Sequence, residues 1–514
     1  MKKAALSVMI ITVLSKFVGF AREMVLSYVY GASALTDAYL ISRTVPSVIF
    51  SFVSAGIATG FIPMYSRILA EHGKDEADRY TSNVSNALLI LASIVAVFVL
   101  LFAEPVVKVF ALGFSGDTLD MAITLTRISV FGVFFTGLAN IFSGYLRLHG
   151  DFIIPALIGF PMNFVIIVSL FLSSRTNIYV LAIGTVVSTA SQVLLCIPFL
   201  AKADYRHRLV LDMSNEHLRA MVLLALPVIM GTAVNDINVL VDRTMASQLA
   251  VGGISALNYA KHLNGFVQGL FVVSVTTVLY PMISKMAAEG NLKSLKAHLA
   301  EAMAMVNLLV VPATAGAMIF SREIVTLLFG RGAFTPEAID MTGTALRYYS
   351  IGMIAFGLRD VLTRAFYSLQ DTRTPMANSA VAVLVNIALN IILAKFLGIG
   401  GLALATSISA IVSAALMFIT LRKKIGPFGL KETAKSFAKM VGASILMGIA
   451  AYHSFVLFRR FLVQNAALIA AIGVGALTYG ILILFMKIPE VDRTVEAVKH
   501  RLRKRFLQRR GPEA

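Results

Sequence analysis

The sequence has one cysteine and no tryptophan, and only 14% of its 514 residues are charged. The single thiol, Cys196, excludes a disulfide framework within the chain, and no Cys/His cluster has the spacing of a zinc site. The low charge, the 58% of hydrophobic residues and the mean hydropathy of +0.82 exclude a soluble globular fold. Too few polar side chains remain to cover the surface of such a fold.

Recognisable catalytic motifs are also absent. The sequence has no Gly-x-x-x-x-Gly-Lys-Ser/Thr loop, which excludes a P-loop nucleotide site. Neither His-Glu-x-x-His nor Gly-x-Ser-x-Gly occurs, and the eight histidines are scattered. We therefore expect a protein that is not an enzyme and that has no organic cofactor.

The apolar stretches predict membrane-spanning helices. Each is roughly 20 residues long and lacks the alternation of a barrel strand, and only helices and closed barrels satisfy their backbone hydrogen bonds in hydrocarbon. We predict an all-α polytopic membrane protein with 14 transmembrane helices. The predicted spans are residues 4–30, 34–62, 86–103, 119–146, 155–172, 178–200, 218–246, 255–283, 303–320, 345–369, 377–396, 402–421, 438–456 and 466–486.

The formal net charge of +18 is distributed unevenly. With the amino end in the cytoplasm, Lys and Arg concentrate in the loops on that side, as the positive-inside rule requires. This pattern explains the basic composition without nucleic acid as a partner. We predict that both termini are cytoplasmic and that the basic tail, residues 491–514, lies on anionic lipid.

An internal repeat divides the chain. The residues of 120–155 recur at the same spacing in 340–375, so that Asp120, Arg127, Gly137, Asp151 and Pro155 match Asp340, Arg347, Gly357, Asp371 and Pro375. We predict one six-helix lobe in residues 1–203, a second in 204–425, and two further helices in 426–490. Because each lobe has an even number of spans, both have the same orientation, and the substrate is expected between them.

Ionisable side chains inside the predicted spans form a first candidate site. Such groups are costly in hydrocarbon and normally face a partner or a wet cavity. The residues are Lys16, Arg22, Glu23, Asp37, Arg43, Lys261 and His262. Converging bases suit a phosphate or diphosphate, which arginine grips with two hydrogen bonds at once. The alternatives are that Arg22 pairs internally with Glu23 or Asp37, that Lys16 and Asp37 extend to the headgroups from helix ends, and that Lys261 and His262 merely lie at a helix end.

A second polar group lies in the other half of the chain. It comprises Asn235, Asp236, Asn238, Asp242, Arg243, Asn386, Asn390 and Thr406. Asn386 and Asn390 share one helix face because they are four residues apart. Oxygen atoms of these side chains could enclose a monovalent cation, and Na⁺ or H⁺ would then be the coupling ion of a transporter. We favour the competing interpretation, hydrogen bonding between helices.

Several motifs resemble the MurJ/MviN lipid II flippases of the MOP exporter superfamily. They are Gly19-Phe20-Ala21-Arg22-Glu23, Tyr30-Gly31-Ala32, Thr36-Asp37-Ala38-Tyr39, Phe61-Ile62-Pro63, Leu328-Phe329-Gly330-Arg331-Gly332-Ala333-Phe334 and Asp371-Thr372-x-Thr374-Pro375. The resemblance implies a bacterial cytoplasmic-membrane protein that moves the undecaprenyl-diphosphate-linked peptidoglycan precursor, lipid II, to the outer leaflet. It further implies two lobes in a V around a central cationic cavity, with helices 13 and 14 forming a groove for the lipid tail.

The sequence departs from the family pattern at several of these positions. Lys16 stands where the family has arginine, and Phe50 where the family commonly has a base; Arg43, seven residues earlier, is the candidate replacement. His262, preceded by Lys261, stands where the family has arginine on the eighth helix.

The resemblance also bears on the coupling ion. The family's sodium site would correspond to Asp242, Asn386, Asn390 and Thr406. Asn390 stands where a carboxylate is expected, which predicts weaker cation binding or none.

These observations lead to a flippase that works by alternating access, with the diphosphate held by the bases. Membrane lipids and the lipid-linked precursor are the expected partners, and wall-synthesis proteins are candidates. Two alternatives stay open: an exporter of another polyprenyl-diphosphate-linked glycan, and a MATE-like cation-coupled antiporter. The antiporter is disfavoured because cationic drugs would require acidic pockets, whereas the bases outnumber the acids here.

Overall fold

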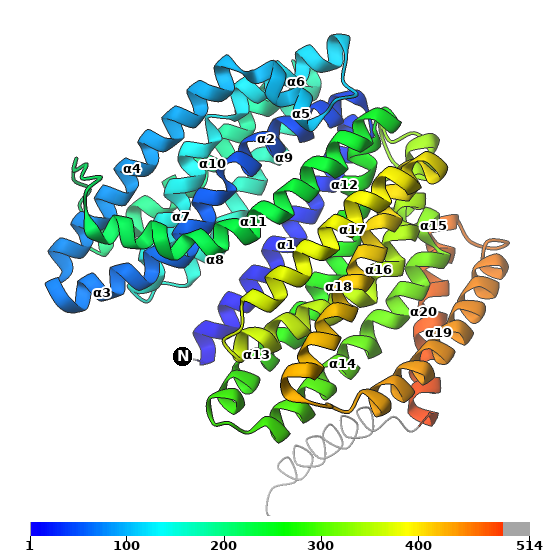
Figure 1. Cartoon of the computed structure of the whole chain (residues 1–514). Coiled ribbons are helices and arrows are strands. Elements are labelled where there is room, and N and C mark those ends of the chain that lie inside the picture. Colours follow the sequence, from blue (N-terminus) through cyan, green and yellow to red (C-terminus); the bar gives the residue numbers. More distant parts are fainter. Residues whose placement is uncertain (1, 487–514) are drawn as a thin grey trace, which may run out of the picture. The chain divides into compact units, whose positions relative to one another are not determined.

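The computed structural model describes residues 2–486, which contain helices and no strand. The predicted all-α class is therefore confirmed, while the predicted basic tail, 491–514, lies outside the described residues. The elements are α1 (Lys2–Tyr30), α2 (Ala34–Gly56), η1 (Ile57–Phe61), α3 (Ile62–His72), α4 (Lys74–Leu101), α5 (Ala103–Phe110), α6 (Gly116–Ser129), α7 (Gly132–Leu148), α8 (Ile153–Leu157), α9 (Gly159–Arg175), α10 (Tyr179–Lys202), α11 (Glu216–Leu249), α12 (Gly253–Val267), η2 (Gln268–Val272), α13 (Val273–Ala288), α14 (Leu292–Ile319), α15 (Ser321–Phe329), α16 (Pro336–Ser368), α17 (Arg373–Leu397), α18 (Ile399–Ile425), α19 (Leu430–Phe458) and α20 (Gln464–Phe485) (Figure 1).

Many of these helices can cross a membrane. Within the described residues, 10 helices are long and apolar enough, or up to 12 if each of two bent helix pairs forms one span. The protein is thus a multi-pass membrane protein, since an exposed apolar surface of this extent requires a lipid environment. The number 14 is not confirmed and stays a prediction.

The chain forms two compact units. The first comprises Met1–Tyr259, Leu328–Met341 and Asn390–Leu402, and the second comprises Ala260–Leu327, Thr342–Leu389 and Ala403–Ala514. Two segments from the second half of the sequence thus pack with the first unit. The lobe boundaries read from the internal repeat stay a prediction.

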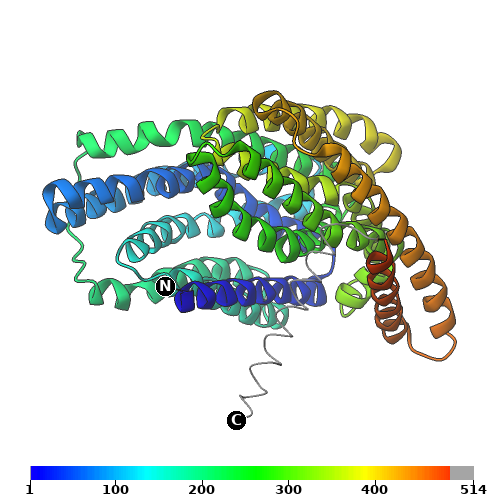
Figure 2. The ribbon, with the colours of Figure 1, turned by 90° about the horizontal axis from the view of Figure 1, so that it is seen from below.

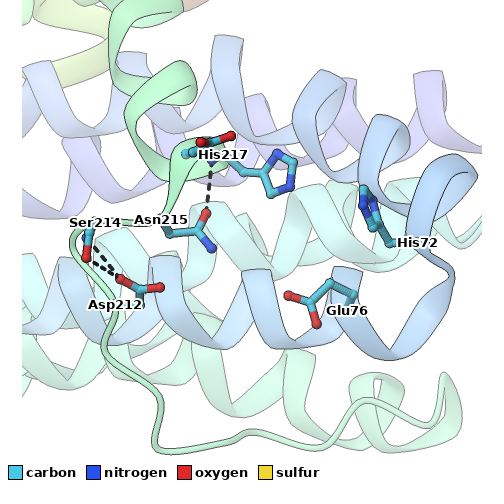
Figure 3. Close-up of a pocket in the computed structure, with 7 residues that line it drawn as sticks. His72, Glu76, Asp212, Ser214, Asn215 and His217 are labelled. Carbon is cyan, nitrogen blue, oxygen red and sulfur yellow. Dashed lines mark hydrogen bonds between the residues drawn. The ribbon is translucent and has the colours of Figure 1, made fainter.

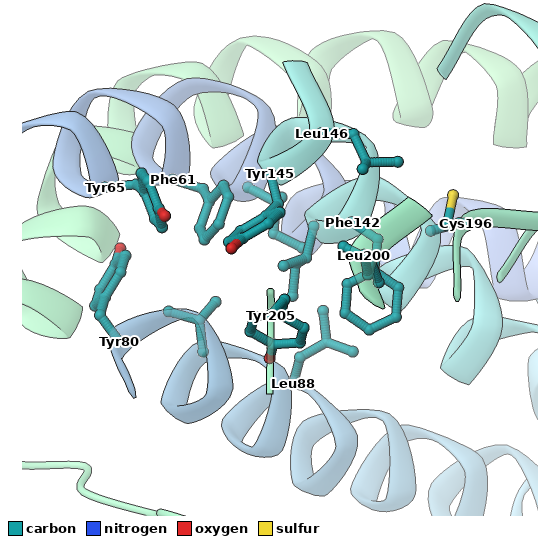
Figure 4. Packing of buried hydrophobic residues seen from close by; sticks show 14 of the residues in the cluster. Phe61, Tyr65, Tyr80, Leu88, Phe142, Tyr145, Leu146, Cys196, Leu200 and Tyr205 are labelled. Atoms are coloured by element: carbon teal, nitrogen blue, oxygen red, sulfur yellow. The ribbon is translucent and has the colours of Figure 1, made fainter. Parts of the chain in front are cut away.

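Aromatic packing dominates one end of the first unit (Figure 4). Phe61 stacks on Tyr80 with ring centroids 6.0 Å apart, and Tyr145 contacts Tyr205 at 5.0 Å. Cys196 is fully buried in the same cluster. These ring contacts fix η1 to α4, and α7 to the connector that follows α10, because aromatic pairs add stabilisation beyond the area that they bury.

In the second unit, α19 and α20 form an antiparallel hairpin, seen side by side in Figures 1 and 2. The hairpin packs on α14, where Val311 shares a buried cluster with Met440 and Ile483. The Tyr479 hydroxyl donates a hydrogen bond of 3.0 Å to the Leu308 carbonyl oxygen. The two last predicted spans, 438–456 and 466–486, therefore exist as helices of the second unit.

Candidate functional site

Arg22 and Glu23 on α1 form a buried ion pair in the first unit. Arg22 Nη2 lies 2.5 Å from Glu23 Oε1, and Arg22 Nη1 donates to Asn163 Oδ1 on α9 at 3.1 Å. The Glu23 side chain is 1% exposed and that of Arg22 is 11% exposed. The pairing weighed as an alternative from sequence is thus present. A buried pair of this kind is maintained by its additional hydrogen bonds, which offset the loss of hydration.

The ion pair continues into a network that joins α1 to α11 and α12. Asn258 Nδ2 donates to Glu23 Oε2 at 3.3 Å, and Arg243 Nη2 donates to Asn258 Oδ1 at 3.2 Å. Arg243 Nη1 also donates to the Ile254 carbonyl oxygen at 3.2 Å. Two guanidinium groups therefore accompany one carboxylate in these four side chains, which leaves the set with a net positive charge.

The Asp37 carboxylate accepts a hydrogen bond from the first turn of α12. Its Oδ1 accepts a hydrogen bond of 2.7 Å from the Ser255 backbone N–H, in the first turn of α12, and the residue is 2% exposed. A carboxylate at a helix N-terminus is stabilised by unpaired backbone N–H groups and by the helix dipole. The contact shown for Asp37 is therefore with the backbone. Its predicted part in substrate binding stays a prediction.

A glycine-rich turn supports the end of α1. Gly31 has φ of +64°, and a Cβ atom there would lie 2.3 Å from the Ala333 carbonyl oxygen. The Ala333 N–H donates to the Tyr28 carbonyl oxygen at 2.9 Å, so residues 328–341 dock directly on α1. The sequence predicts no contact between this segment and α1, because a contact between residues some 300 positions apart leaves no local pattern.

Aromatic rings enclose this turn. Tyr259 packs on Phe329 and Phe334 with centroid distances of 5.0 and 5.5 Å. Its hydroxyl donates to the Gly31 carbonyl oxygen at 3.1 Å. All three rings are buried, and electrostatic interactions between neighbouring charges are stronger in such surroundings than in water.

Arg43 is held differently. It is half-buried, and its Cζ lies 5.5 Å from the centroid of the Tyr39 ring, the geometry of a cation–π contact. Phe50, which lacks the family's base, is 2% exposed and belongs to the hydrophobic core of the first unit. A base at position 50 would therefore be buried among apolar side chains in this protein.

The remaining predicted bases are exposed: Lys16 on α1, and Lys261 and His262 on α12. Lys16 belongs to the first unit, whereas Lys261 and His262 belong to the second. The structure thus brings Arg22, Glu23 and their amide partners together within one unit. Binding of one ligand by all seven predicted residues stays a prediction.

The predicted cation ligands form two hydrogen-bonded pairs. Asn390 Nδ2 donates to Asp242 Oδ1 at 2.7 Å in the first unit, and Asn386 Nδ2 donates to Thr406 Oγ1 at 3.3 Å in the second. Such bonds between helices are what the packing interpretation predicts. The four residues stay a prediction as a site for Na⁺, and the coupling ion stays undecided between Na⁺ and H⁺.

A polar pocket of about 560 Å³ lies in the first unit, between the junction of α3 with α4 and the connector that leads into α11 (Figure 3). It is lined by His72, Glu76, Asp212, Ser214, Asn215, Glu216 and His217. Asp212 Oδ1 accepts hydrogen bonds from Ser214, and Asn215 caps α11. No residue of the predicted site lines this pocket, and its carboxylates do not suit an anionic ligand.

Comparison with known proteins identifies the family. The family model for the lipid II flippase MurJ matches residues 26–472. The chain belongs to the MurJ lipid II flippase family. A probable lipid II flippase MurJ of Buchnera aphidicola is 28% identical over 426 residues, covering 81% of this chain and 82% of that protein.

Solved structures show the same relationship. The structure of a lipid II flippase MurJ in an inward closed conformation is 26% identical, has a TM-score of 0.80, and matches 92% of this chain and 97% of that one. A multidrug resistance MATE transporter of the MOP superfamily, in an inward-facing conformation, matches 82% of this chain and 98% of its own at 16% identity and a TM-score of 0.68. That likeness shows the fold alone.

Proposed function

We propose that this protein is a lipid II flippase. It moves the undecaprenyl-diphosphate-linked peptidoglycan precursor from the cytoplasmic to the outer leaflet of the bacterial cytoplasmic membrane. The observation that carries the proposal is the family match over residues 26–472. The buried network around Arg22 and Glu23 adds chemical support. With the charged side chains that interact with it, it contains three arginines, Arg22, Arg43 and Arg243, and two carboxylates, Glu23 and Asp37, which leaves a net positive charge among apolar helices.

The diphosphate binds by electrostatics and hydrogen bonding. A twice-negative group competes with Glu23 for the Arg22 guanidinium and takes up the in-plane donors of Arg43. Arg22 is positioned by Asn163 and Glu23, so its guanidinium is already oriented before the ligand arrives. No covalent bond is made or broken, and the protein therefore acts as a transporter and not as an enzyme.

Alternating access carries the headgroup across while the prenyl chain stays in lipid along α19 and α20. An inside-negative membrane potential favours outward movement of an anion by about 2.3 kcal/mol per charge for each 100 mV. In this scheme both termini are cytoplasmic, wall-synthesis proteins are candidate partners, and Na⁺ or H⁺ serves as the coupling ion if one is used.

Accessibility of lipid II at the outer leaflet tests the proposal. Cells depleted of their own flippase should accumulate precursor on the inside, and expression of this protein should restore both outer-leaflet labelling and growth. An exporter of a different glycan would leave labelling and growth unrestored. That result would reject lipid II as the substrate.

A further inference from the structure

One face of α16 is polar in the part that corresponds to the predicted span 345–369. By helical spacing this face carries Phe356, Arg359, Asp360, Thr363, Arg364 and Tyr367. The opposite face is fully buried through Val361, Leu362, Ala365 and Phe366. None of the charged residues of this face belongs to the candidate sites predicted from the sequence, although charges inside a predicted span are a signal that could have found them.

The two arginines of this face are half-buried and stack on aromatic rings. Arg359 Cζ lies 5.3 Å from the Phe356 ring centroid, and Arg364 Cζ lies 5.6 Å from the ring centroid of Tyr280 on α13. Within the described residues neither guanidinium forms a salt bridge. A guanidinium stacked on a ring keeps its N–H donors at its edge, where they can donate in pairs to a carboxylate.

The internal repeat shows that the fold does not require these charges. When Asp120 is matched with Asp340 and Pro155 with Pro375, the residues equivalent to Arg359, Asp360 and Arg364 are Ala139, Asn140 and Gly144 on α7. Ala139 and Gly144 are buried, and Asn140 donates to Ser54 Oγ at 3.2 Å. The first half thus uses the same positions for packing between helices, so the charges of the second half serve another purpose.

Hydrocarbon is not a suitable environment for this face. Ionised side chains within a membrane-spanning helix normally face water or a partner, because their insertion into acyl chains is unfavourable. Neighbouring elements pack along both edges of this face: Gln268 Nε2 donates to the Met353 carbonyl oxygen at 2.6 Å, and on α18 Ser407 Oγ donates to the Tyr348 carbonyl oxygen at 2.6 Å. Met417 of α18 also lies 3.6 Å from Thr363 Oγ1. Between these edges Asp360 is half-buried and Tyr367 is exposed, so this part of the face is the one available to a polar ligand.

We propose that Arg359 and Arg364 form a second anion-binding site, which takes the carboxylates of the peptide in the transported headgroup. This inference rests on the proposed function, since it assigns part of the same substrate. The two arginines are five residues apart, or about 7.5 Å along the helix axis. Asp360 adds a negative charge on the same face. Five residues also correspond to about 140° around the helix, so Arg359 and Arg364 lie at the two edges of this face with Asp360 between them. Charges of alternating sign spread across a face match an extended zwitterionic peptide better than they match a compact diphosphate.

Binding of two purified lipids to the full-length protein tests the inference. The first probe is undecaprenyl-diphosphate-disaccharide-pentapeptide, and the second is the same lipid without the peptide. R359Q/R364Q should bind the peptide-bearing lipid at least about tenfold more weakly, the loss of one or two charge-assisted hydrogen bonds, and should bind the peptide-free lipid as the unsubstituted protein does. R359K/R364K should recover part of the affinity.

R347Q is the matched control. Arg347 lies on the same helix, is exposed, and has a counterpart in the first half, Arg127, so its removal should change binding of neither lipid. Equal weakening for both lipids would assign the arginines to the diphosphate and overturn the peptide site. Unchanged affinity of R359Q/R364Q for both lipids would overturn it as well.

The same samples separate this inference from the proposed function. If the unsubstituted protein fails to bind either lipid and fails to rescue a flippase-depleted strain, the proposed function is wrong and this inference falls with it. If the unsubstituted protein binds and rescues while R359Q/R364Q, with an unchanged unfolding temperature, does not discriminate against the peptide, only the second site is rejected.

Discussion

Arg22 and Arg43 lie on successive helices of the first unit, yet the protein surrounds them differently. Arg22 is held by a carboxylate and an amide oxygen, whereas Arg43 lies over the Tyr39 ring, and no described carboxylate forms a salt bridge with it. The comparison indicates that the two arginines have different roles. Arg22 belongs to a fixed ionic framework that shapes the site, and Arg43 has donors that a ligand can take directly.

Removing Arg22 should produce the largest effect. Arg22→Ala leaves Glu23 buried without its cation, so we expect loss of transport together with a loss of stability of about 3–5 kcal/mol. Outer-leaflet labelling of lipid II and thermal unfolding of the purified protein measure the two effects. The R22Q/E23Q variant should recover most of the stability but none of the transport. Normal transport in R22A would contradict a role for this network.

Gly31→Ala should weaken the turn that supports the end of α1. The left-handed backbone costs a non-glycine residue about 1–2 kcal/mol, and here the new Cβ would also meet the Ala333 carbonyl oxygen. Gly116, with φ of +51° and no atom within 4 Å of a Cβ, is the matched control. The unfolding temperature of G31A should fall further than that of G116A. Equal losses would show that docking of residues 328–341 contributes nothing to this end of α1.

Arg43→Gln should reduce transport about tenfold and leave the unfolding temperature nearly unchanged, since its loss leaves no buried carboxylate unpaired. Tyr39→Phe keeps the ring beneath the guanidinium and removes the hydroxyl, which contacts both Thr185 and Arg43, so it should reduce transport less than R43Q does. A marked loss of stability in R43Q would place Arg43 in the framework with Arg22 and remove the distinction between them.

The smallest effect is expected at Asp371, in the loop before α17. Burial by itself would raise the pKa of this carboxyl, but hydrogen bonds from Lys424 and Thr374 outweigh it and lower the pKa to about 2. Because the folded pKa lies below the ordinary value of 3.8 for this side chain, the ionised form stabilises the fold above about pH 4, and this contribution is lost as the pH falls towards 2. The unfolding temperature of D371N should therefore be lower than that of the unsubstituted protein at pH 7. The two unfolding temperatures should become equal near pH 2.

Local sequence was sufficient to predict the helical class and the final hairpin, α19 and α20. Uninterrupted apolar runs and flanking charges are short-range signals, and a membrane leaves few alternatives to helix. The ion pair of Arg22 and Glu23 could also be anticipated, because the two residues are adjacent. Helix boundaries were less predictable. The helices α4 and α14 begin at Lys74 and Leu292, well before the predicted spans 86–103 and 303–320, because each helix continues from its apolar run into a polar segment.

Long-range partners could not be predicted. Asn163 and Asn258 complete the network around Arg22, yet they are far from it in sequence and resemble other amides within apolar helices. The docking of residues 328–341 on α1 depends on backbone contacts at Gly31 and Gly332, which a single sequence does not reveal. The burial of Phe50 likewise follows only from the packing around it.

The complete burial of Cys196 has a practical consequence. Since it is the only cysteine of the chain and is 0% exposed, maleimide reagents should find almost no background target in the folded protein. Cysteines introduced one at a time into the loops would then report, through labelling from either side of the bilayer, which loops face the cytoplasm. Pairs of such introduced cysteines could be labelled with fluorophores to follow opening and closing during a transport cycle.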